Sequence, residues 1–159
     1  MSRKILITIV VVLLVVVILG AYFIFNYNKS SSQPSKNGNG LTEFEVQGMK
    51  VKILSYGSGA EAKVGDLVTT HYVGILEDGK EFDSSVGRNL PFSFQLGQGR
   101  VIRGWDLGVV GMKVGEKREL TIPPDLAYGL DGFPPTIPPQ ANLIYTITLL
   151  EISASLPTN

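Results

Sequence analysis

VIRGWDLGVV, residues 101–110, is the one segment of residues 41–159 with the spacing of an amphipathic helix. Ile102, Trp105 and Val109 recur every three or four residues, so they lie on one face of such a helix. Gly111 follows directly, and glycine is the usual residue at this position because it adopts the left-handed conformation that closes the last turn. The sequence therefore predicts one short helix that presents a tryptophan on its inner face.

The segments around this helix alternate apolar and polar residues with the period of two that is typical of half-buried strands. In residues 67–76, for example, Val68, Thr70, Tyr72 and Leu76 fall on one face. The tetrapeptide EDGK at 77–80 carries the Asp-Gly step of a tight hairpin. We therefore predict an α+β domain in which an antiparallel sheet folds over the helix. The predicted strands are residues 50–55, 67–76, 92–96, 116–122 and 143–149.

Before the domain, residues 5–25 form an uncharged run in which only Thr8 and Gly20 fall outside the apolar class. A helix of about 20 such residues spans the hydrocarbon core of a bilayer. A cleaved signal peptide is the alternative, but its apolar region usually runs about 7–15 residues and ends at a small-x-small site. The run here is longer, and aromatic residues close it, as at a membrane interface. We predict an uncleaved transmembrane helix at 5–25, preceded by a short basic segment at 1–4.

Residues 26–40 are rich in Asn, Ser, Gly, Lys and Gln, a composition that cannot bury apolar surface. We expect a disordered polar linker here, followed by the folded domain at residues 41–159. Two basic residues and the amino terminus precede the apolar run, whereas two lysines follow it within the linker. This small excess of positive charge favours a single-pass membrane protein with a cytoplasmic N-terminus and the domain outside the cytoplasm.

The residue inventory excludes several kinds of chemistry. The 159 residues include no cysteine, which excludes disulfides, a thiolate nucleophile and cysteine zinc sites. The chain balances 14 basic against 14 acidic groups, but its first 40 residues hold four of the basic groups and no acid. The domain is therefore net acidic, and nothing in its charge favours binding to nucleic acid.

His71 is the only histidine, and it could be imagined as a triad with Asp83 and Ser84. No nucleophile-elbow sequence surrounds this serine, however, so a structural or exposed histidine is the better interpretation. The acidic residues lack the spacing of a calcium loop, and no pair of histidines is present to hold zinc. The glycines match neither a dinucleotide fingerprint nor a P-loop. We therefore expect no metal and no cofactor.

An unusual number of aromatic residues stands at the ends of the predicted strands and loops. Burial in the core explains any single one of them, but one short helix cannot cover so many rings. The alternative is an apolar pocket beside Trp105, with Asp83, the Tyr128 hydroxyl and backbone N–H groups as its polar contacts. The Ile102 amide lies in the first turn of the helix, where N–H groups have no intrahelical partner. The aromatic residues are Tyr72, Phe82, Phe92, Trp105, Tyr128, Phe133 and Tyr145.

Nine motifs between residues 46 and 152 occur in the same order and with similar spacing in one family of proteins. They are Tyr72, LEDGK at 76–80, FDSS at 82–85, RN at 88–89, PFSF at 91–94, LG at 96–97, VIRGW at 101–105, AYG at 127–129 and IPP at 137–139. Together they closely resemble the FKBP-type peptidyl-prolyl cis-trans isomerases, the macrolide-binding immunophilins. The resemblance covers essentially the whole predicted domain.

This resemblance implies a five- or six-stranded antiparallel sheet wrapped around one short helix, with the pocket between them. Trp105 would form the pocket floor, and the Ile102 N–H and Tyr128 hydroxyl would bind ligand carbonyls. Asp83 would be an acidic hydrogen-bond partner, held in turn by Arg88. The resemblance further implies substrate-binding roles for Tyr72, Phe82, Phe92, Val101, Ile137 and Tyr145.

The chain departs from the family pattern at a few pocket positions. Tyr145 stands where the family usually has phenylalanine, and its hydroxyl must find a partner or water. Phe133 and Thr136 lie in the loop over the pocket, where related proteins vary, so substrate preference would differ. Tyr128 and Ile137 are too close in sequence to accommodate the chaperone domain that some relatives insert here.

The leading prediction is a membrane-tethered peptidyl-prolyl cis-trans isomerase that assists the folding of exported or membrane-proximal chains. Its partners would be unfolded or nascent polypeptides that contain proline, with macrolides as inhibitors, and we expect a monomer. The competing interpretation is a catalytically weak binding or chaperone module with the same fold. A purely structural domain is disfavoured, because every aromatic residue of the pocket would then have to be buried.

Overall fold

The computed structural model describes residues 35–36 and 42–153 of the chain. In these residues eight strands form one sheet whose pairings are all antiparallel. Helix α2, Arg103–Val109, is the only α-helix of the described residues, and η1, Pro124–Leu126, is a single 3-10 turn. The strands are β1 Ser35–Lys36, β2 Thr42–Val46, β3 Met49–Ser55, β4 Leu67–Leu76, β5 Glu81–Ser84, β6 Phe92–Gln95, β7 Lys117–Ile122 and β8 Leu143–Ser153.

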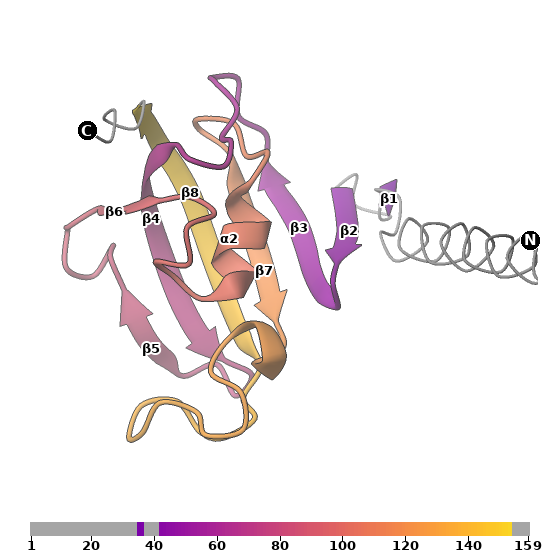
Figure 1. Ribbon diagram of the computed structural model, residues 1–159, viewed down its shortest axis with the longest axis vertical. Coiled ribbons are helices and arrows are strands. Elements are labelled where there is room, and N and C mark those ends of the chain that lie inside the picture. The colour runs from indigo at the N-terminus through magenta and orange to yellow at the C-terminus, as the bar shows by residue number, and fades with distance from the viewer. Residues whose placement is uncertain (1–34, 37–41, 154–159) are drawn as a thin grey trace, which may run out of the picture. The chain divides into compact units, whose positions relative to one another are not determined.

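The sheet confirms the predicted antiparallel α+β architecture, but the expectation of five or six strands was too low. The strand order is β1-β2-β3-β7-β8-β4-β5, and β6 also pairs with β4 (Figure 1). β5 pairs with residues 73–75 of β4, whereas β6 pairs with residues 67–70 on the same edge. One edge position is thus divided between two short strands, because the segment between them leaves the sheet. At the other edge, β1 and β2 extend the sheet beyond β3.

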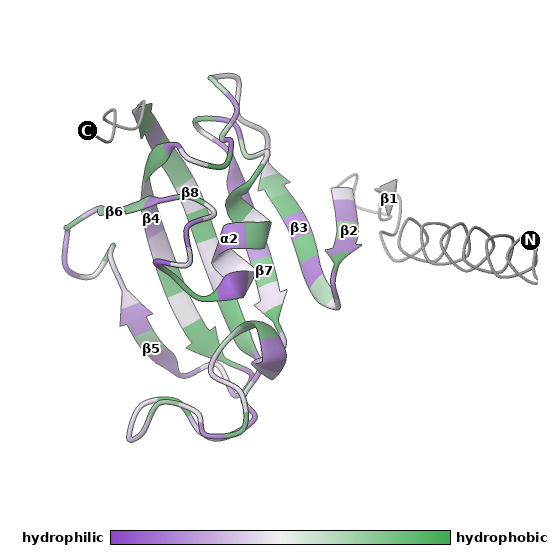
Figure 2. Ribbon diagram, viewed as in Figure 1, coloured by the Kyte–Doolittle hydropathy of each residue, from purple (hydrophilic) through white to green (hydrophobic). Residues whose placement is uncertain are grey.

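Alternation along the long strands buries one face of the sheet. In β4 the side chains of Val68, Thr70, Tyr72 and Leu76 are buried, as the period-two pattern predicted. The same holds for β8, where Leu143, Tyr145, Ile147 and Leu149 are all buried. Figure 2 shows the corresponding bands of hydrophobic and hydrophilic residues along β3. These inward side chains form a single core between the sheet and α2.

Helix α2 lies against β7 through two glycines. A Cβ atom on Gly104 would lie 2.4 Å from a methyl carbon of Ile122, and one on Gly108 would lie 2.5 Å from a methyl carbon of Leu120. Neither distance is possible between real carbon atoms, so only glycine permits this approach. The helix begins two residues later than predicted, because Ile102 has extended dihedral angles, φ −58° and ψ 148°. The adjacent inner position, Trp105, is therefore held at a fixed depth over the sheet.

The carboxyl end of α2 is bound by a side chain from β7. Arg118 Nη1 donates to the carbonyl oxygens of Gly108 at 2.9 Å and Val110 at 3.2 Å, and Arg118 Nε donates to Glu116 Oε1 at 2.5 Å. Both charged side chains are buried. Gly111 has φ +75°, which agrees with its predicted role in ending the helix. The arginine thus supplies donors to carbonyls that the helix itself leaves without partners.

The predicted transmembrane helix at residues 5–25 lies outside the described residues. Within the part of the chain that the structure describes, no helix is long and apolar enough to cross a membrane. Most of the predicted linker at 26–40 also lies outside the described residues. The exception is Ser35–Lys36, which forms the short strand β1 and pairs with β2. The linker as a whole stays a prediction.

Candidate active site

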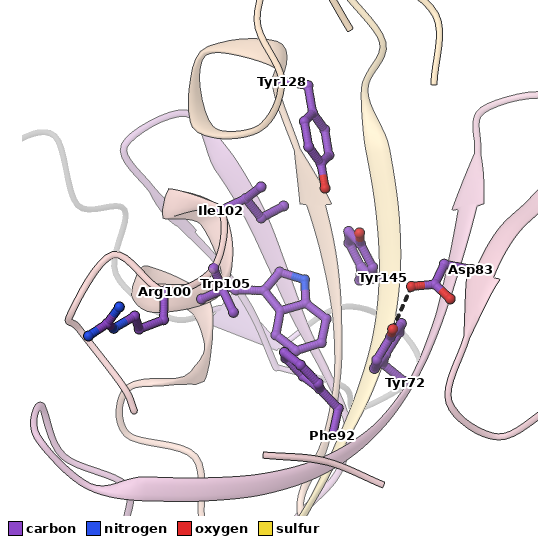
Figure 3. A pocket seen from close by; sticks show the side chains of 9 residues that line it. Tyr72, Asp83, Phe92, Arg100, Ile102, Trp105, Tyr128 and Tyr145 are labelled. Carbon is purple, nitrogen blue, oxygen red and sulfur yellow. Dashed lines mark hydrogen bonds between the residues drawn. The ribbon is translucent and has the colours of Figure 1, made fainter. Parts of the chain in front are cut away.

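A hollow of about 290 Å³ opens between α2, the sheet and two loops. Figure 3 shows its side chains converging from several elements, with the Trp105 indole among them. Tyr72 comes from β4, Tyr145 from β8 and Trp105 from α2, so the sheet and the helix both supply its walls. The lining residues are Tyr72, Asp83, Phe92, Arg100, Val101, Ile102, Trp105, Tyr128 and Tyr145.

The indole of Trp105 is held by four other aromatic rings. The ring centroids of Tyr72, Tyr145, Phe94 and Phe92 lie 5.0, 5.2, 5.5 and 6.0 Å from it, all in edge-to-face arrangements. Such pairs are favourable because the positive edge of one ring meets the negative face of the other. Only 4% of Trp105 is exposed. The hollow therefore has a rigid aromatic base.

Gly74 of β4 makes room for two of the rings. A Cβ atom at this position would lie 2.8 Å from ring carbons of both Phe82 and Tyr145. Gly74 pairs with Tyr145 across the β4–β8 ladder, so the tyrosine ring can lie over the glycine backbone. The Phe82 ring then packs edge-to-face against Tyr145, with centroids 5.5 Å apart.

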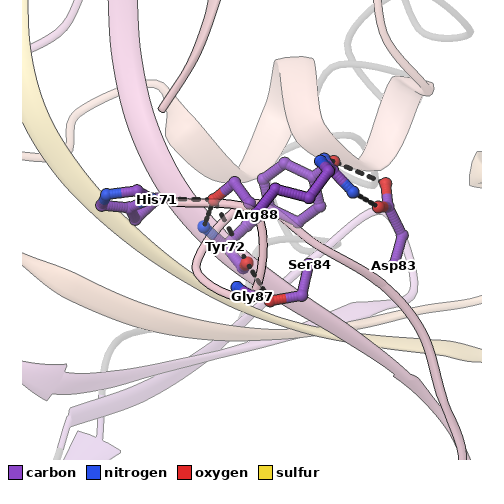
Figure 4. A network of polar contacts seen from close by, with 7 residues as sticks. His71, Tyr72, Asp83, Ser84, Gly87 and Arg88 are labelled. Atoms are coloured by element: carbon purple, nitrogen blue, oxygen red, sulfur yellow. Dashed lines mark hydrogen bonds and ion pairs between the residues drawn. The ribbon is translucent and has the colours of Figure 1, made fainter. Parts of the chain in front are cut away.

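A polar network fixes one rim of the hollow (Figure 4). The Tyr72 hydroxyl donates to Asp83 Oδ2 at 2.5 Å, and Arg88 Nη2 donates to the same hydroxyl at 3.0 Å. Arg88 Nη1 also forms an ion pair with Asp83 Oδ1. Both carboxylate oxygens of Asp83 thus have donors, and its charge is matched by the guanidinium.

This network sets the ionisation of its members. Desolvation raises the pKa of Asp83, but hydrogen bonds from Tyr72 and Arg88 and the charge of Arg88 outweigh it, so that the pKa lies below its ordinary value. Burial, followed by the hydrogen bond to Asp83, raises the pKa of Tyr72. Burial likewise raises the pKa of Tyr128, with a smaller contribution from the charge of Asp83. Asp83 is therefore a carboxylate at neutral pH, and the tyrosines are neutral hydroxyls.

His71 does not line the hollow and does not form the imagined triad. Its Nδ1 lies 2.9 Å from Ser85 Oγ, whereas the Ser84 hydroxyl accepts a hydrogen bond from Gly87 N–H. Ser85 Oγ also accepts from the backbone N–H of Tyr72 at 2.8 Å. These contacts hold the segment that follows β5 against β4. They support the structural interpretation of this histidine.

A family model described as FKBP-type peptidyl-prolyl cis-trans isomerase matches residues 59–150, which include every residue of this hollow. This chain belongs to that family. FK506-binding protein 1A of Aspergillus fumigatus is 53% identical over 107 residues, covering 67% of this chain and 96% of that protein. FK506-binding protein 1 of Saccharomyces cerevisiae is 50% identical over 114 residues, 71% of this chain and all of that protein. A peptidyl-prolyl cis-trans isomerase of Schizosaccharomyces pombe is 49% identical over 107 residues, 67% of this chain and 96% of that protein.

The isomerase domain brings eight of the ten predicted site residues to the hollow. The other two, Phe82 and Ile137, are not among the residues that line it. Phe82 supports the Tyr145 ring, as described above. Ile137 is buried in the core, and its backbone pairs with Phe133 to close a small loop beyond η1. The roles predicted for all ten residues in binding or catalysis remain predictions.

One residue of the isomerase hollow was not predicted. Arg100 lines its outer rim, is exposed, and points its guanidinium away from the indole (Figure 3). Its only signal in the sequence is its position, directly before the VIRGW motif. Charge alone did not distinguish it, because arginine is common on protein surfaces.

Proposed function

We propose that this FKBP-type isomerase twists X–Pro amides in the aromatic hollow, and that it does so on polypeptides outside the cytoplasm while tethered to a membrane. Rotation of an amide has a barrier of about 18–20 kcal/mol, and unaided X–Pro isomerisation takes tens of seconds or longer. No covalent bond must break. The catalyst therefore needs only to bind the twisted amide more tightly than the planar one.

The observation that carries the catalytic proposal is the set of rings fixed around Trp105. A planar amide is stiff because its resonance separates charge, and water stabilises that charge. A hollow that replaces water by rings favours the less polar, twisted amide. About 5–7 kcal/mol of such preference corresponds to an acceleration of about 10⁴ to 10⁵.

The polar groups at the edge of the hollow would position the peptide. The first intrahelical hydrogen bond of α2 runs from Trp105 N–H to Ile102 O, so the Ile102 N–H lies ahead of the helix and is suited to a ligand carbonyl. The Tyr128 hydroxyl is a second donor at the opposite rim. Asp83 would keep the Tyr72 ring in place through its short hydrogen bond. Macrolides, which the family binds, would compete for the same hollow.

Two substitutions test this site. Trp105→Ala removes the base of the hollow, and we expect kcat/KM on a proline tetrapeptide to fall by about 100-fold or more. Asp83→Ala frees the Tyr72 ring from a charged hydrogen bond, and we expect a fall of about tenfold with the fold intact. The measurement is a protease-coupled isomerase assay, with circular dichroism as the check on folding.

Lys117→Ala, which changes an exposed side chain of β7, is the matched control and should keep the wild-type rate. Equal rates for the wild type and both hollow variants would remove the assignment of the site. A wild type that binds a macrolide without measurable turnover would instead support the binding-module interpretation.

The tether is proposed from the sequence. Residues 5–25 are long and apolar enough for one crossing, and the basic residues before them favour a cytoplasmic N-terminus. A domain held near a membrane would meet chains as they emerge, when their prolines are still accessible. An aromatic hollow that binds one proline and the residue before it contacts too few side chains to recognise a long sequence. We therefore expect it to accept many different substrates.

A further inference from the structure

Tyr145 differs from the other tyrosines of the hollow because its ring is locked while its hydroxyl has no partner among the described residues. The ring packs against Trp105 at 5.2 Å, Phe82 at 5.5 Å and Tyr72 at 6.0 Å between centroids, and only 5% of the residue is exposed. Three rings and the Gly74 backbone thus fix its orientation. The position of the hydroxyl is therefore fixed as well.

The Tyr145 hydroxyl makes no hydrogen bond to any residue in the described part of the chain. It is also not sealed in the core, because Trp105 Nε1 is the only fully enclosed side-chain polar atom of the described residues that lacks a partner. The hydroxyl therefore borders the hollow that Tyr145 lines. Asp83, the carboxylate of the network, already receives bonds from Tyr72 and Arg88.

A phenylalanine would fill the same space without this unsatisfied group. A ligand that fills the hollow excludes water from this hydroxyl, and a hydroxyl left there without a partner is unfavourable, so the bound ligand should supply an acceptor. Burial raises the pKa of Tyr145 far above its ordinary value, with smaller contributions from Tyr128, Tyr72 and Asp83. The group is thus a neutral hydroxyl, and it can donate at any working pH.

We propose that the Tyr145 hydroxyl donates a hydrogen bond to a backbone carbonyl of the bound peptide that flanks the X–Pro amide. The inference rests on the proposed function, that the hollow binds X–Pro segments. It adds to the aromatic wall a specific polar contact that a phenylalanine could not make.

The chemistry of the amide decides which carbonyl is the acceptor. The oxygen of the X–Pro amide itself carries most negative charge when the amide is planar, so a donor there would stabilise the ground state and slow rotation. A flanking carbonyl keeps its charge while the X–Pro bond turns. A hydrogen bond to this flanking carbonyl stabilises the ground state and the transition state equally. Loss of the bond would therefore raise KM and leave kcat unchanged.

Tyr145→Phe tests the contact, because it removes one oxygen and keeps the ring. We expect KM for a proline tetrapeptide to rise about fivefold and kcat to stay within about twofold of wild type. The melting temperature should be unchanged, since the hydroxyl makes no hydrogen bond within the described residues and the ring that packs in the core is kept. The control is Tyr56→Phe, which removes a hydroxyl from an exposed tyrosine that bonds to Thr42 and does not line the hollow.

The wild-type rate separates this inference from the function on which it rests. A wild type without turnover would overturn the proposed function. An active wild type whose KM is unchanged or lowered by Tyr145→Phe would overturn the inference alone. A fall in kcat at constant KM would also overturn it, because the hydroxyl would then act on the rotating amide.

Thioamide peptides locate the acceptor, because sulfur accepts hydrogen bonds more weakly than oxygen. Two peptides each carry one thiocarbonyl, either at the proline carbonyl or at the carbonyl before residue X. We expect one of the two thioamide peptides to have a higher KM with the wild type than the parent peptide has. For that peptide, Tyr145→Phe should not raise KM any further. If Tyr145→Phe raises KM by the same factor for the parent peptide and for both thioamides, the hydroxyl does not bond to either flanking carbonyl, and the proposal is contradicted.

Discussion

At the scale of single residues, the hollow contains groups whose charge does not change near neutral pH. The pKa of Asp83 is held below its ordinary value, whereas those of Tyr72, Tyr128 and Tyr145 are raised above theirs. The carboxylate therefore stays ionised and the hydroxyls stay protonated between pH 6 and 8. A site built in this way suits a reaction that needs no proton transfer.

We expect kcat/KM to vary by less than about twofold between pH 6 and 8, because no group of the hollow is placed to serve as a general acid or base. The measurement is the isomerase assay in buffers of constant ionic strength. A steep bell-shaped profile in this range would show that a titrating group takes part. His71→Gln serves as the control, since within the described residues its side chain bonds only to Ser85, which does not line the hollow.

The low pKa of Asp83 also fixes the sign of its effect on stability. A carboxyl whose pKa falls on folding stabilises the native state above the unfolded pKa, near 3.8. That contribution is lost as the pH falls through the lower, folded value. The domain should therefore lose the stability contributed by the Asp83–Arg88 pair only below about pH 4. This loss should be small, because the pair is partly exposed to solvent.

Sequence reasoning located most of the hollow because aromatic residues in register carry a strong signal. It could not separate residues that line the hollow from apolar residues that pack elsewhere in the domain, such as Phe82 and Ile137. Their types suit either place, and only the packing over Gly74 decides for Phe82. Arg100 was missed for the opposite reason, since a charged residue in a loop has no pattern that marks it.

At the scale of elements, α2 is too short to be stable alone, and its neighbours hold it. Its glycine face lets it approach Ile122 and Leu120 of β7, and Arg118 of the same strand donates to its last carbonyls. β7 thus fixes both the depth and the end of the helix that carries Trp105. The integrity of the hollow depends on this strand.

Arg118→Met should destabilise the domain strongly, by about 3–5 kcal/mol, because it leaves the buried Glu116 without its ion pair and the helix carbonyls without donors. The double variant Glu116→Met with Arg118→Met should lose less than the single one, since no unpaired charge remains. Urea unfolding followed by Trp105 fluorescence measures both. Lys117→Met, at the exposed position between them, is the control. A double variant at least as unstable as Arg118→Met alone would contradict this account.

The long strands were predicted well, because β4 and β8 have strict alternation over many residues. The short strand β6 was also predicted, but β2 and β5 were not, because β5 has only four residues and a bulge, and β2 has no fully buried position. The buried pair of Glu116 and Arg118 could not be foreseen either. Charged residues two apart on a strand usually face solvent, and here the end of a helix determines their burial.

At the scale of the whole molecule, the isomerase domain and the rest of the chain are separable. The three relatives described above are covered over 96–100% of their own length, yet they match only 67–71% of this chain. Those proteins thus consist of little more than this domain. Catalysis should reside in the domain, and the segment before it should decide where catalysis occurs.

Removal of residues 1–32 should therefore change the location of the protein and leave its isomerase activity intact. The shortened chain, residues 33–159, keeps β1 and should retain the full-length kcat/KM on a tetrapeptide within about twofold, because no residue of the hollow is lost. The full chain should stay with membranes after carbonate extraction, whereas the shortened chain should remain soluble.

Protease added to intact cells then tests the orientation. We expect the domain of the full chain to be digested while a cytoplasmic marker survives, as the charges flanking residues 5–25 imply. Digestion only after cell lysis would indicate the opposite orientation, with the domain in the cytoplasm. Release of the full chain by carbonate would refute the membrane anchor. Because the domain carries its own hollow, either result would leave the isomerase assignment intact and would move only the place where X–Pro bonds are turned.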